Sequence, residues 1–241
     1  MVVSGPFVAS VVDANDKTAL TERTDSGGTV WVKGEPGDEF FVTIRQLYDI
    51  GHAATAHINV DGKDLGYSLV WKRGPFVSSP LGPPKSGQSW DDSDMVTHAF
   101  KFMRHVAPQP SADDERRVPA AGSVTVTFYR AVVSADQTAP RQDTTSEWTG
   151  STDTAVASHK KEQASLRAGV GSVPGRLPRA ADTFYDHKEV LATITIRYTT
   201  DFGIAVRGLY TPDEVNMPSS PAKKKMKKEA GGTSADDAIV V

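Results

Sequence analysis

The sequence predicts an all-β protein, an antiparallel β-sandwich of the jelly-roll or immunoglobulin-like kind with one or two short helices and long loops. Two observations predict it. Apolar and polar residues alternate with a period of two in seven or eight short segments between about residues 29 and 199. Helical periodicity is confined to at most two short segments, whereas parallel strands need crossovers of a dozen or more residues. The strands are therefore expected to pair antiparallel.

The first segment, residues 1–28, is expected to be only partly ordered. Turn-forming residues are frequent there and include the Asp-Ser-Gly-Gly cluster at 25–28. One short strand is expected at 7–12, and continuous order is expected to begin near Thr29.

Two hairpins are predicted next. Residues 29–33 and 40–45 both alternate, and the Gly-Glu-Pro-Gly-Asp cluster between them favours a turn. In the second hairpin, Asp61-Gly62 supplies a two-residue type I′ turn between strands at 54–60 and 65–71.

Three later strands are predicted at 96–102, 123–130 and 191–199. The segments between them, 107–122 and 133–180, are expected to be flexible excursions. Residues 133–155 are mostly polar and offer too little apolar surface to offset the entropy of ordering. A short helix is expected around 158–166. The sandwich domain is thus expected to span residues 29–211.

After the last strand the apolar period changes to that of a helix. Phe202, Ala205, Val206 and Leu209 follow an i, i+3, i+4, i+7 spacing, and Thr200 is placed as the N-cap. These four side chains are predicted to form the face that packs on the sheet.

A resemblance accompanies this pattern. The words Gly-Asp-Glu-Phe at 37–40, Val-Asp-Gly at 60–62 and Phe-Tyr-Arg at 128–130, followed by Ser-His at 158–159 and the strand at 191–198, are similar to an uncharacterised domain family common in fungal genomes. The resemblance covers about residues 29–211. It implies a β-sandwich, and it implies no activity and no catalytic residue.

Composition limits the classes of protein to consider. The chain has no cysteine, no Asn-x-Ser/Thr acceptor and no run of 18 apolar residues, and its first twelve residues lack the basic and apolar order of a signal peptide. A location in the nucleus or the cytoplasm is therefore expected, without a membrane span. Removing the five tail lysines from a net charge of −3 leaves −8. Such an acidic body is not expected to bind nucleic acid.

No catalytic residue is predicted. The chain has no Gly-x-Ser-x-Gly and no phosphate-binding loop, and the glycines at 169, 171 and 175 lack the strand-to-helix context of a dinucleotide site. A triad assembled from distant positions stays open as an alternative. A concave pocket that gathers polar residues such as His57, His98 or Arg130 would support it.

No metal site and no cofactor are predicted either. His52 and His57 fall on opposite faces of a strand, and His98 and His105 are separated by a strand end, so isolated surface histidines are expected. The acidic residues at 91–94 lack the glycine and glutamate of a calcium loop. We interpret them as a solvated turn that protects a strand edge.

Three of the four tryptophans are interpreted in two ways. Trp31 and Trp71 lie in strand patterns and are predicted to be core or cross-strand residues. Trp148 stands alone in a polar segment, where it is expected either to dock back on the sheet or to contact a partner.

The tail, residues 212–241, is predicted to be disordered and to carry an address. Five lysines follow a proline-containing segment, and their like charges keep the strip extended. Such a strip is typical of a nuclear localisation signal read by an import receptor. A solubilising end and loose contact with a polyanion or an anionic membrane surface are the alternatives. The residues concerned are Lys223, Lys224, Lys225, Lys227 and Lys228.

Together these features lead to two hypotheses about function. The first is a non-enzymatic protein-binding or scaffold module, directed to the nucleus by its tail. The second is a structural, self-assembling β-sandwich protein, such as a capsid-associated or matrix component, because an acidic body and a basic tail attract each other. The sequence names neither the partner nor the oligomeric state.

Overall fold

The computed structural model describes residues 1–84, 94–104, 122–135, 166–178 and 185–210. Several expectations fall outside these ranges: the loop predicted at 107–122 apart from Gly122, the helix around 158–166 apart from Leu166, the acidic turn apart from Asp94, Trp148 and the tail lysines. The described residues from Met1 to Leu209 belong to one compact unit.

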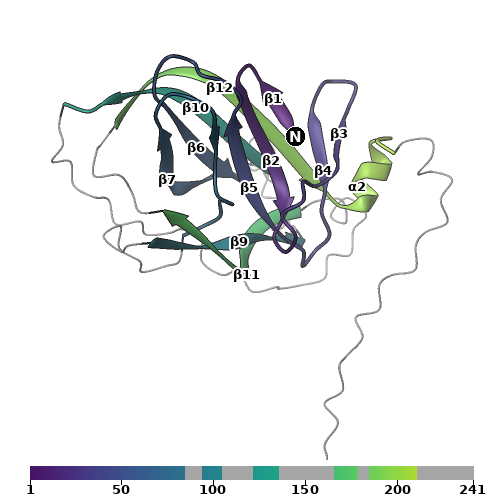
Figure 1. Cartoon of the computed structure of the whole chain (residues 1–241). Coiled ribbons are helices and arrows are strands. Elements are labelled where there is room, and N and C mark those ends of the chain that lie inside the picture. The colour runs from purple at the N-terminus through teal and green to yellow at the C-terminus, as the bar shows by residue number, and fades with distance from the viewer. Residues whose placement is uncertain (85–93, 105–121, 136–165, 179–184, 211–241) are drawn as a thin grey trace, which may run out of the picture. The chain divides into compact units, whose positions relative to one another are not determined.

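Two six-stranded sheets dominate this unit (Figure 1). The first sheet has the order β1-β2-β5-β9-β11, with β8 also paired to β5, and the second has the order β3-β4-β12-β10-β6-β7. The strands of the first sheet are β1 (Val2–Ser4), β2 (Phe7–Asp13), β5 (Glu39–Gln46), β8 (Phe76–Val77), β9 (Asp94–Arg104) and β11 (Leu166–Pro178). Those of the second are β3 (Glu22–Thr24), β4 (Val30–Lys33), β6 (Ala54–Val60), β7 (Lys63–Trp71), β10 (Ser123–Val133) and β12 (Tyr185–Thr199). The prediction of a mostly β protein is confirmed.

Both sheets contribute to the larger of two apolar clusters among the described residues. Phe7 of the first sheet stacks on Phe128 of the second with ring centroids 4.3 Å apart, and Phe40 stacks on Phe102 at the same separation. Each buried side chain of this size stabilises the fold by roughly 1.5–3 kcal/mol relative to its exposed state. The core therefore joins the two sheets directly.

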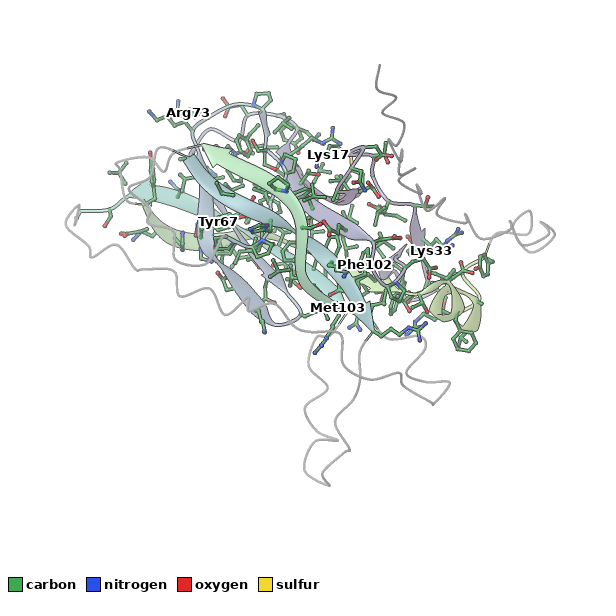
Figure 2. The ribbon with its side chains drawn as sticks, turned by 90° about the horizontal axis from the view of Figure 1, so that it is seen from below. Lys17, Lys33, Tyr67, Arg73, Phe102 and Met103 are labelled. Atoms are coloured by element: carbon green, nitrogen blue, oxygen red, sulfur yellow. The ribbon has the colours of Figure 1, made fainter. Side chains whose placement is uncertain are left out.

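The second predicted hairpin is confirmed. β6 and β7 pair antiparallel, and Asp61 and Gly62 between them have φ values of 53° and 81°. Two consecutive positive φ angles are the requirement of a type I′ turn. Tyr67 of β7, labelled in Figure 2, is buried and donates its hydroxyl to the Gly82 carbonyl oxygen at 2.9 Å.

The first predicted hairpin is wrong. β4 belongs to the second sheet, where it pairs with β3 and lies parallel to β12, whereas β5 belongs to the first sheet. Residues 34–38 therefore cross from one sheet to the other. Gly34 makes the crossing possible, because it donates to the Thr199 carbonyl oxygen at 2.9 Å and a Cβ there would lie 2.7 Å from the Phe102 ring. Among the strands that the structure describes, the β4–β12 pair is also the exception to the antiparallel arrangement that we predicted.

The N-terminal segment is more ordered than the sequence indicated. The short strand expected at 7–12 is β2, which is paired on both sides and buried along almost its whole length. Phe7 and Val11 contact the main core, while Val12 packs with Ala14 and Phe41 in a second cluster on the opposite face. Burial on both faces removed the alternating pattern that would have marked the strand.

The later strands agree with prediction in position and exceed it in length. The strands expected at 96–102, 123–130 and 191–199 lie within β9, β10 and β12. β10 and β12 run side by side (Figure 1) and pair from Ser123–Arg197 as far as Val133–Tyr185, with a bulge near Tyr129. β11 was not predicted, because its glycines and prolines interrupt any period.

Helix α2 (Asp201–Val206) begins as predicted and presents a different face. The Thr200 hydroxyl accepts a hydrogen bond from the Gly203 N–H at 3.2 Å, which confirms the N-cap. However, Ile204 is fully buried, whereas Phe202 and Val206 are 41% and 66% exposed. The predicted face is wrong because β12 fixes the direction of entry at Thr200, and this direction turns Ile204 toward the core.

Candidate functional site

Two of the predicted aromatic residues are placed as expected. Trp31 and Trp71 are both buried, and the Trp71 indole donates to Gln46 Oε1 at 2.8 Å. Trp31 donates to Asp25 Oδ2 at 2.9 Å and lies under the Arg207 guanidinium. Both are therefore structural residues.

No helix within the described ranges is long and apolar enough to cross a membrane.

The second sheet ends in a ribbon that is two-stranded beyond Arg130, and we define the ribbon as residues 129–133 of β10 and 185–190 of β12. Pairing of β10 with β6 stops at Arg130, whereas its pairing with β12 continues to Val133. Tyr129 pairs with Val190, Ala131 with His187 and Val133 with Tyr185. Paired residues share a face of a sheet. One face of the ribbon therefore combines aromatic rings with exposed valines.

The outer edge of the ribbon is open among the strands that the structure describes. β4 pairs with β12 only from Ile196 to Thr199, so among the described strands residues 185–195 of β12 are hydrogen-bonded to a neighbouring strand on one side only, although β1 also lies close to β12. Such an edge presents backbone N–H and C=O groups that can pair with another chain.

A polar cluster lies at the base of the ribbon, on the outward face of the second sheet. We define the histidine cluster as His57, Asp64, Ser68, Tyr129 and His187. His57 Nε2 lies 2.8 Å from Ser68 Oγ, 3.1 Å from His187 Nδ1 and 3.2 Å from His187 Nε2. Asp64 Oδ2 lies 3.7 Å from His57 Nδ1. The Tyr129 ring stacks against the His187 ring with centroids 5.5 Å apart.

Local pairing explains how the cluster forms. His57 of β6 and Ser68 of β7 are register partners, so their side chains emerge on one face. Asp64, at the start of β7, reaches the other nitrogen of the same imidazole. His187 arrives from β12 because β12 has extra residues opposite Tyr129, and these shift the register. The expectation of isolated surface histidines is wrong for this pair.

Ser68, His57 and Asp64 stand in the order of nucleophile, base and acid. Two features distinguish this arrangement from a catalytic triad, in which the base activates the serine. The carboxylate is 3.7 Å from Nδ1, beyond hydrogen-bonding distance, and the Nε2 atom that would accept the serine proton is shared with His187. The dispersed triad that the sequence left open is therefore present in residue type, with a geometry that does not favour proton transfer from Ser68.

The environment favours a neutral imidazole at His187. Partial burial lowers the pKa of His187, and the neighbouring His57 lowers it further, against the opposing effect of Asp186. A neutral ring keeps one nitrogen lone pair available as an acceptor or a metal ligand.

The other polar residues of interest do not join this cluster. His98 lies in β9 of the first sheet, and Arg130 pairs with Glu189 at 3.6 Å on the ribbon. His52 contacts the Ala53 carbonyl oxygen through Nδ1 at 3.0 Å. Within the described ranges, no group of three or more His, Cys, Asp or Glu side chains could hold a metal ion.

The glycine-rich segment of β11 binds a carboxylate of the protein itself, the side chain of Glu39. The Glu39 carboxylate accepts hydrogen bonds from the Ser172 N–H, the Ser172 hydroxyl and the Val173 N–H, each at 2.8 Å. The segment bulges between Val170 and Pro174, and this bulge turns its N–H groups toward Glu39. Burial opposes the effect, but these hydrogen bonds lower the pKa of Glu39.

The fold and site together define a mostly β protein, whose described residues form two six-stranded sheets and one small helix, with an exposed ribbon and a histidine cluster at its base. No protein-family model, curated protein or solved structure matches the chain. The resemblance to a fungal domain family accordingly stays a prediction.

Proposed function

We propose that this protein is a non-enzymatic binding or scaffold module built on a β-sandwich of jelly-roll or immunoglobulin-like type, and that another protein pairs with the open edge of β12. Two sheets with a shared core are the arrangement expected of a sandwich. The observation that carries the proposal is the open edge at residues 185–195 beside exposed valines.

The ribbon has the two properties that strand addition requires. Backbone groups along an open edge supply hydrogen bonds, and apolar side chains beside it supply specificity. Val133 and Val190 are 56% and 58% exposed although valine favours burial. A partner segment in extended conformation would cover both valines and pair with the edge.

Two features of the histidine cluster argue against a catalytic function. The Ser68–His57–Asp64 geometry lacks a hydrogen bond between the carboxylate and the imidazole, which lie 3.7 Å apart. The cluster also lies on the outward face of a sheet. A serine nucleophile needs hydrogen-bond donors that stabilise the charge of the transition state in a site without water, and on this face water would weaken that stabilisation.

A charge at the ribbon tests the partner surface. In affinity capture from the native cell, wild type and Val77→Lys are expected to retain the same partner, and Val190→Lys is expected to lose it. Val77 is the matched control because it is an equally apolar residue, 69% exposed, in the first sheet. Circular dichroism must show that both variants fold. A partner that Val190→Lys retains in full would contradict the proposed surface.

The five tail lysines test the proposed destination. The full chain fused to a fluorescent protein is expected to accumulate in the nucleus, and the variant with Lys223, Lys224, Lys225, Lys227 and Lys228 changed to Ser is expected to spread through the cytoplasm. A wild-type fusion that stays cytoplasmic would contradict nuclear delivery and would leave the ribbon surface unaffected.

Self-assembly is the second candidate, because an open edge can also pair with a second copy of the same chain. Light scattering coupled to size-exclusion chromatography distinguishes the two. A monomer at all concentrations supports a separate partner, whereas an oligomer that Val190→Lys dissociates supports assembly through the ribbon.

A further inference from the structure

The nitrogen atoms of two histidines that are 130 residues apart in sequence come within 3.1 Å of each other. β10 lies between their strands, so His57 of β6 and His187 of β12 meet across it. The two rings are almost perpendicular, at 89°, with centroids 4.3 Å apart. His57 Nε2 is nearly equidistant from both nitrogens of His187, at 3.1 Å and 3.2 Å.

The charge of Asp64 favours one tautomer of the His57 ring, although 3.7 Å is too long for a hydrogen bond. The Asp64 carboxylate faces Nδ1 and attracts the ring proton to that nitrogen. The lone pair then resides on Nε2, which is the atom that points toward Ser68 Oγ and His187. A carboxylate behind a histidine is the usual outer-shell arrangement of metal-binding imidazoles.

We propose that His57 and His187 together bind one divalent transition-metal ion, with Asp64 as the outer-shell partner of His57. With metal–nitrogen bonds of about 2.05 Å, donor atoms 3.1 Å apart subtend about 98° at the ion. This angle lies between the right angle of an octahedral site and the wider angle of a tetrahedral one. The exposed His187 ring must turn about its side-chain bonds to direct a lone pair at the ion.

The donor set determines the class of ion. Imidazole nitrogens suit Zn²⁺, Cu²⁺ and Ni²⁺, whereas Mg²⁺ and Ca²⁺ prefer oxygen ligands. Affinity is expected to be highest for Cu²⁺, following the usual order of divalent first-row ions. Water and Ser68 Oγ complete the coordination, because the described residues offer no third His, Cys, Asp or Glu ligand. The ion therefore keeps positions open toward solvent.

The alternative to a metal site is a pair of imidazoles that share a proton. At 3.1 Å, two charged rings would repel each other, so one proton between them is the arrangement that the geometry allows without a metal. A shared proton predicts no selectivity among divalent ions. Titration with several divalent ions therefore separates the two possibilities.

The test is calorimetric titration of the untagged full chain with Cu²⁺, Zn²⁺, Ni²⁺ and Mg²⁺. Wild type is expected to bind one equivalent of the first three ions and no Mg²⁺. His57→Ala and His187→Ala are each expected to weaken Zn²⁺ binding by more than roughly tenfold, and Asp64→Asn by roughly tenfold. His52→Ala is the matched control, because His52 lies outside the cluster, and it is expected to bind as wild type does.

If the calorimetric signal is weak, spectroscopy provides a second test of the proposal. Electron paramagnetic resonance of the Cu²⁺ complex is expected to show two equivalent nitrogen donors in wild type and one in His187→Ala. Circular dichroism confirms that each variant folds. Equal Zn²⁺ affinity in wild type, His57→Ala and His187→Ala would overturn the proposal, and so would binding that only His52→Ala removes.

Discussion

The Asp61 carboxylate accepts a hydrogen bond from the Ala168 N–H at 2.5 Å, although 107 residues separate the two. Its other oxygen accepts from the Gly122 N–H at 2.6 Å and the Ser123 N–H at 3.0 Å. One turn residue thus ties the β6–β7 hairpin to β10 in the same sheet and to β11 in the other. The fold therefore requires two things of residue 61, a positive φ for the turn and a carboxylate that accepts these hydrogen bonds.

We expect Asp61→Asn to separate these requirements. Asparagine tolerates a φ of 53°, so the turn is retained, but its amide nitrogen cannot accept the hydrogen bonds of the replaced oxygen. The free energy of unfolding is expected to fall by about 1–3 kcal/mol because buried N–H groups lose their acceptor. Urea denaturation measures it. An unchanged midpoint and slope would show that the hydrogen bonds of Asp61 do not stabilise the fold.

The same variant tests the titration of Asp61. Burial raises the pKa of Asp61, against the opposing effect of Tyr198 and the three backbone N–H groups. The folded state therefore binds the proton more tightly than the unfolded state, so this contribution to stability is present at acid pH and is lost as pH rises through the folded pKa. The difference in unfolding free energy between wild type and Asp61→Asn is expected to increase as the pH is lowered.

Glu39 is expected to behave in the opposite direction. Hydrogen bonds from Ser172 and Val173 lower its pKa despite partial burial. Its contribution is therefore present above the unfolded pKa of about 4.3 and is lost as pH falls through the lower folded value. Glu39→Gln is expected to cost roughly 1 kcal/mol at pH 7, since solvent screens a half-exposed carboxylate. Denaturation curves from pH 7 to pH 3 should show the two proteins converging.

Gly34→Ala tests the crossing between the sheets. The added methyl group would lie 2.7 Å from the buried Phe102 ring, so we expect a loss of about 1–3 kcal/mol. Phe102→Leu removes the ring atoms that the methyl group meets. In that background, Gly34→Ala is expected to cost less, and a thermal double-mutant cycle measures the coupling. Additive effects would show that the two residues do not interact.

The orientation of α2 gives a contrast between two neighbouring residues. Ile204 is fully buried and Val206 is mostly exposed. Ile204→Ala is expected to cost about 2–5 kcal/mol through lost burial and the cavity left behind. Val206→Ser is expected to stay within about 0.5 kcal/mol, as surface substitutions do. The reverse order in urea denaturation would restore the helix face predicted from the sequence.

Sequence patterns were sufficient where the signal is local. The Asp61-Gly62 turn depends on two consecutive φ angles that few residues adopt, and the Thr200 cap depends on one hydroxyl and one N–H. Alternation located the strands around Phe100, Val126 and Ile194 for the same reason, because it records which side chains face inward. β2 was expected at 7–12, but its place in the centre of a sheet was not, because burial on both of its faces leaves no alternation to detect.

The histidine cluster carried no such signal. The predicted hairpin with a regular register would pair His57 with Gly66, and His57 pairs with Ser68 because the register shifts between His57 and Asn59. His187 required two further facts, the pairing of β12 with β10 and the bulge near Tyr129. Neither can be found in a stretch of sequence taken alone, so the pair appeared as two unrelated surface residues.

By itself the sequence determined the mostly β class, the β6–β7 hairpin, the helix cap and the composition of the lysine-rich segment. Only the tertiary structure decided that β4 and β5 lie in different sheets, that Ile204 faces the core and that His57 meets His187. The physical reason is that alternation and turn propensity act within one segment. Strand pairing instead depends on which arrangement of all the strands buries the most apolar surface while satisfying their hydrogen bonds.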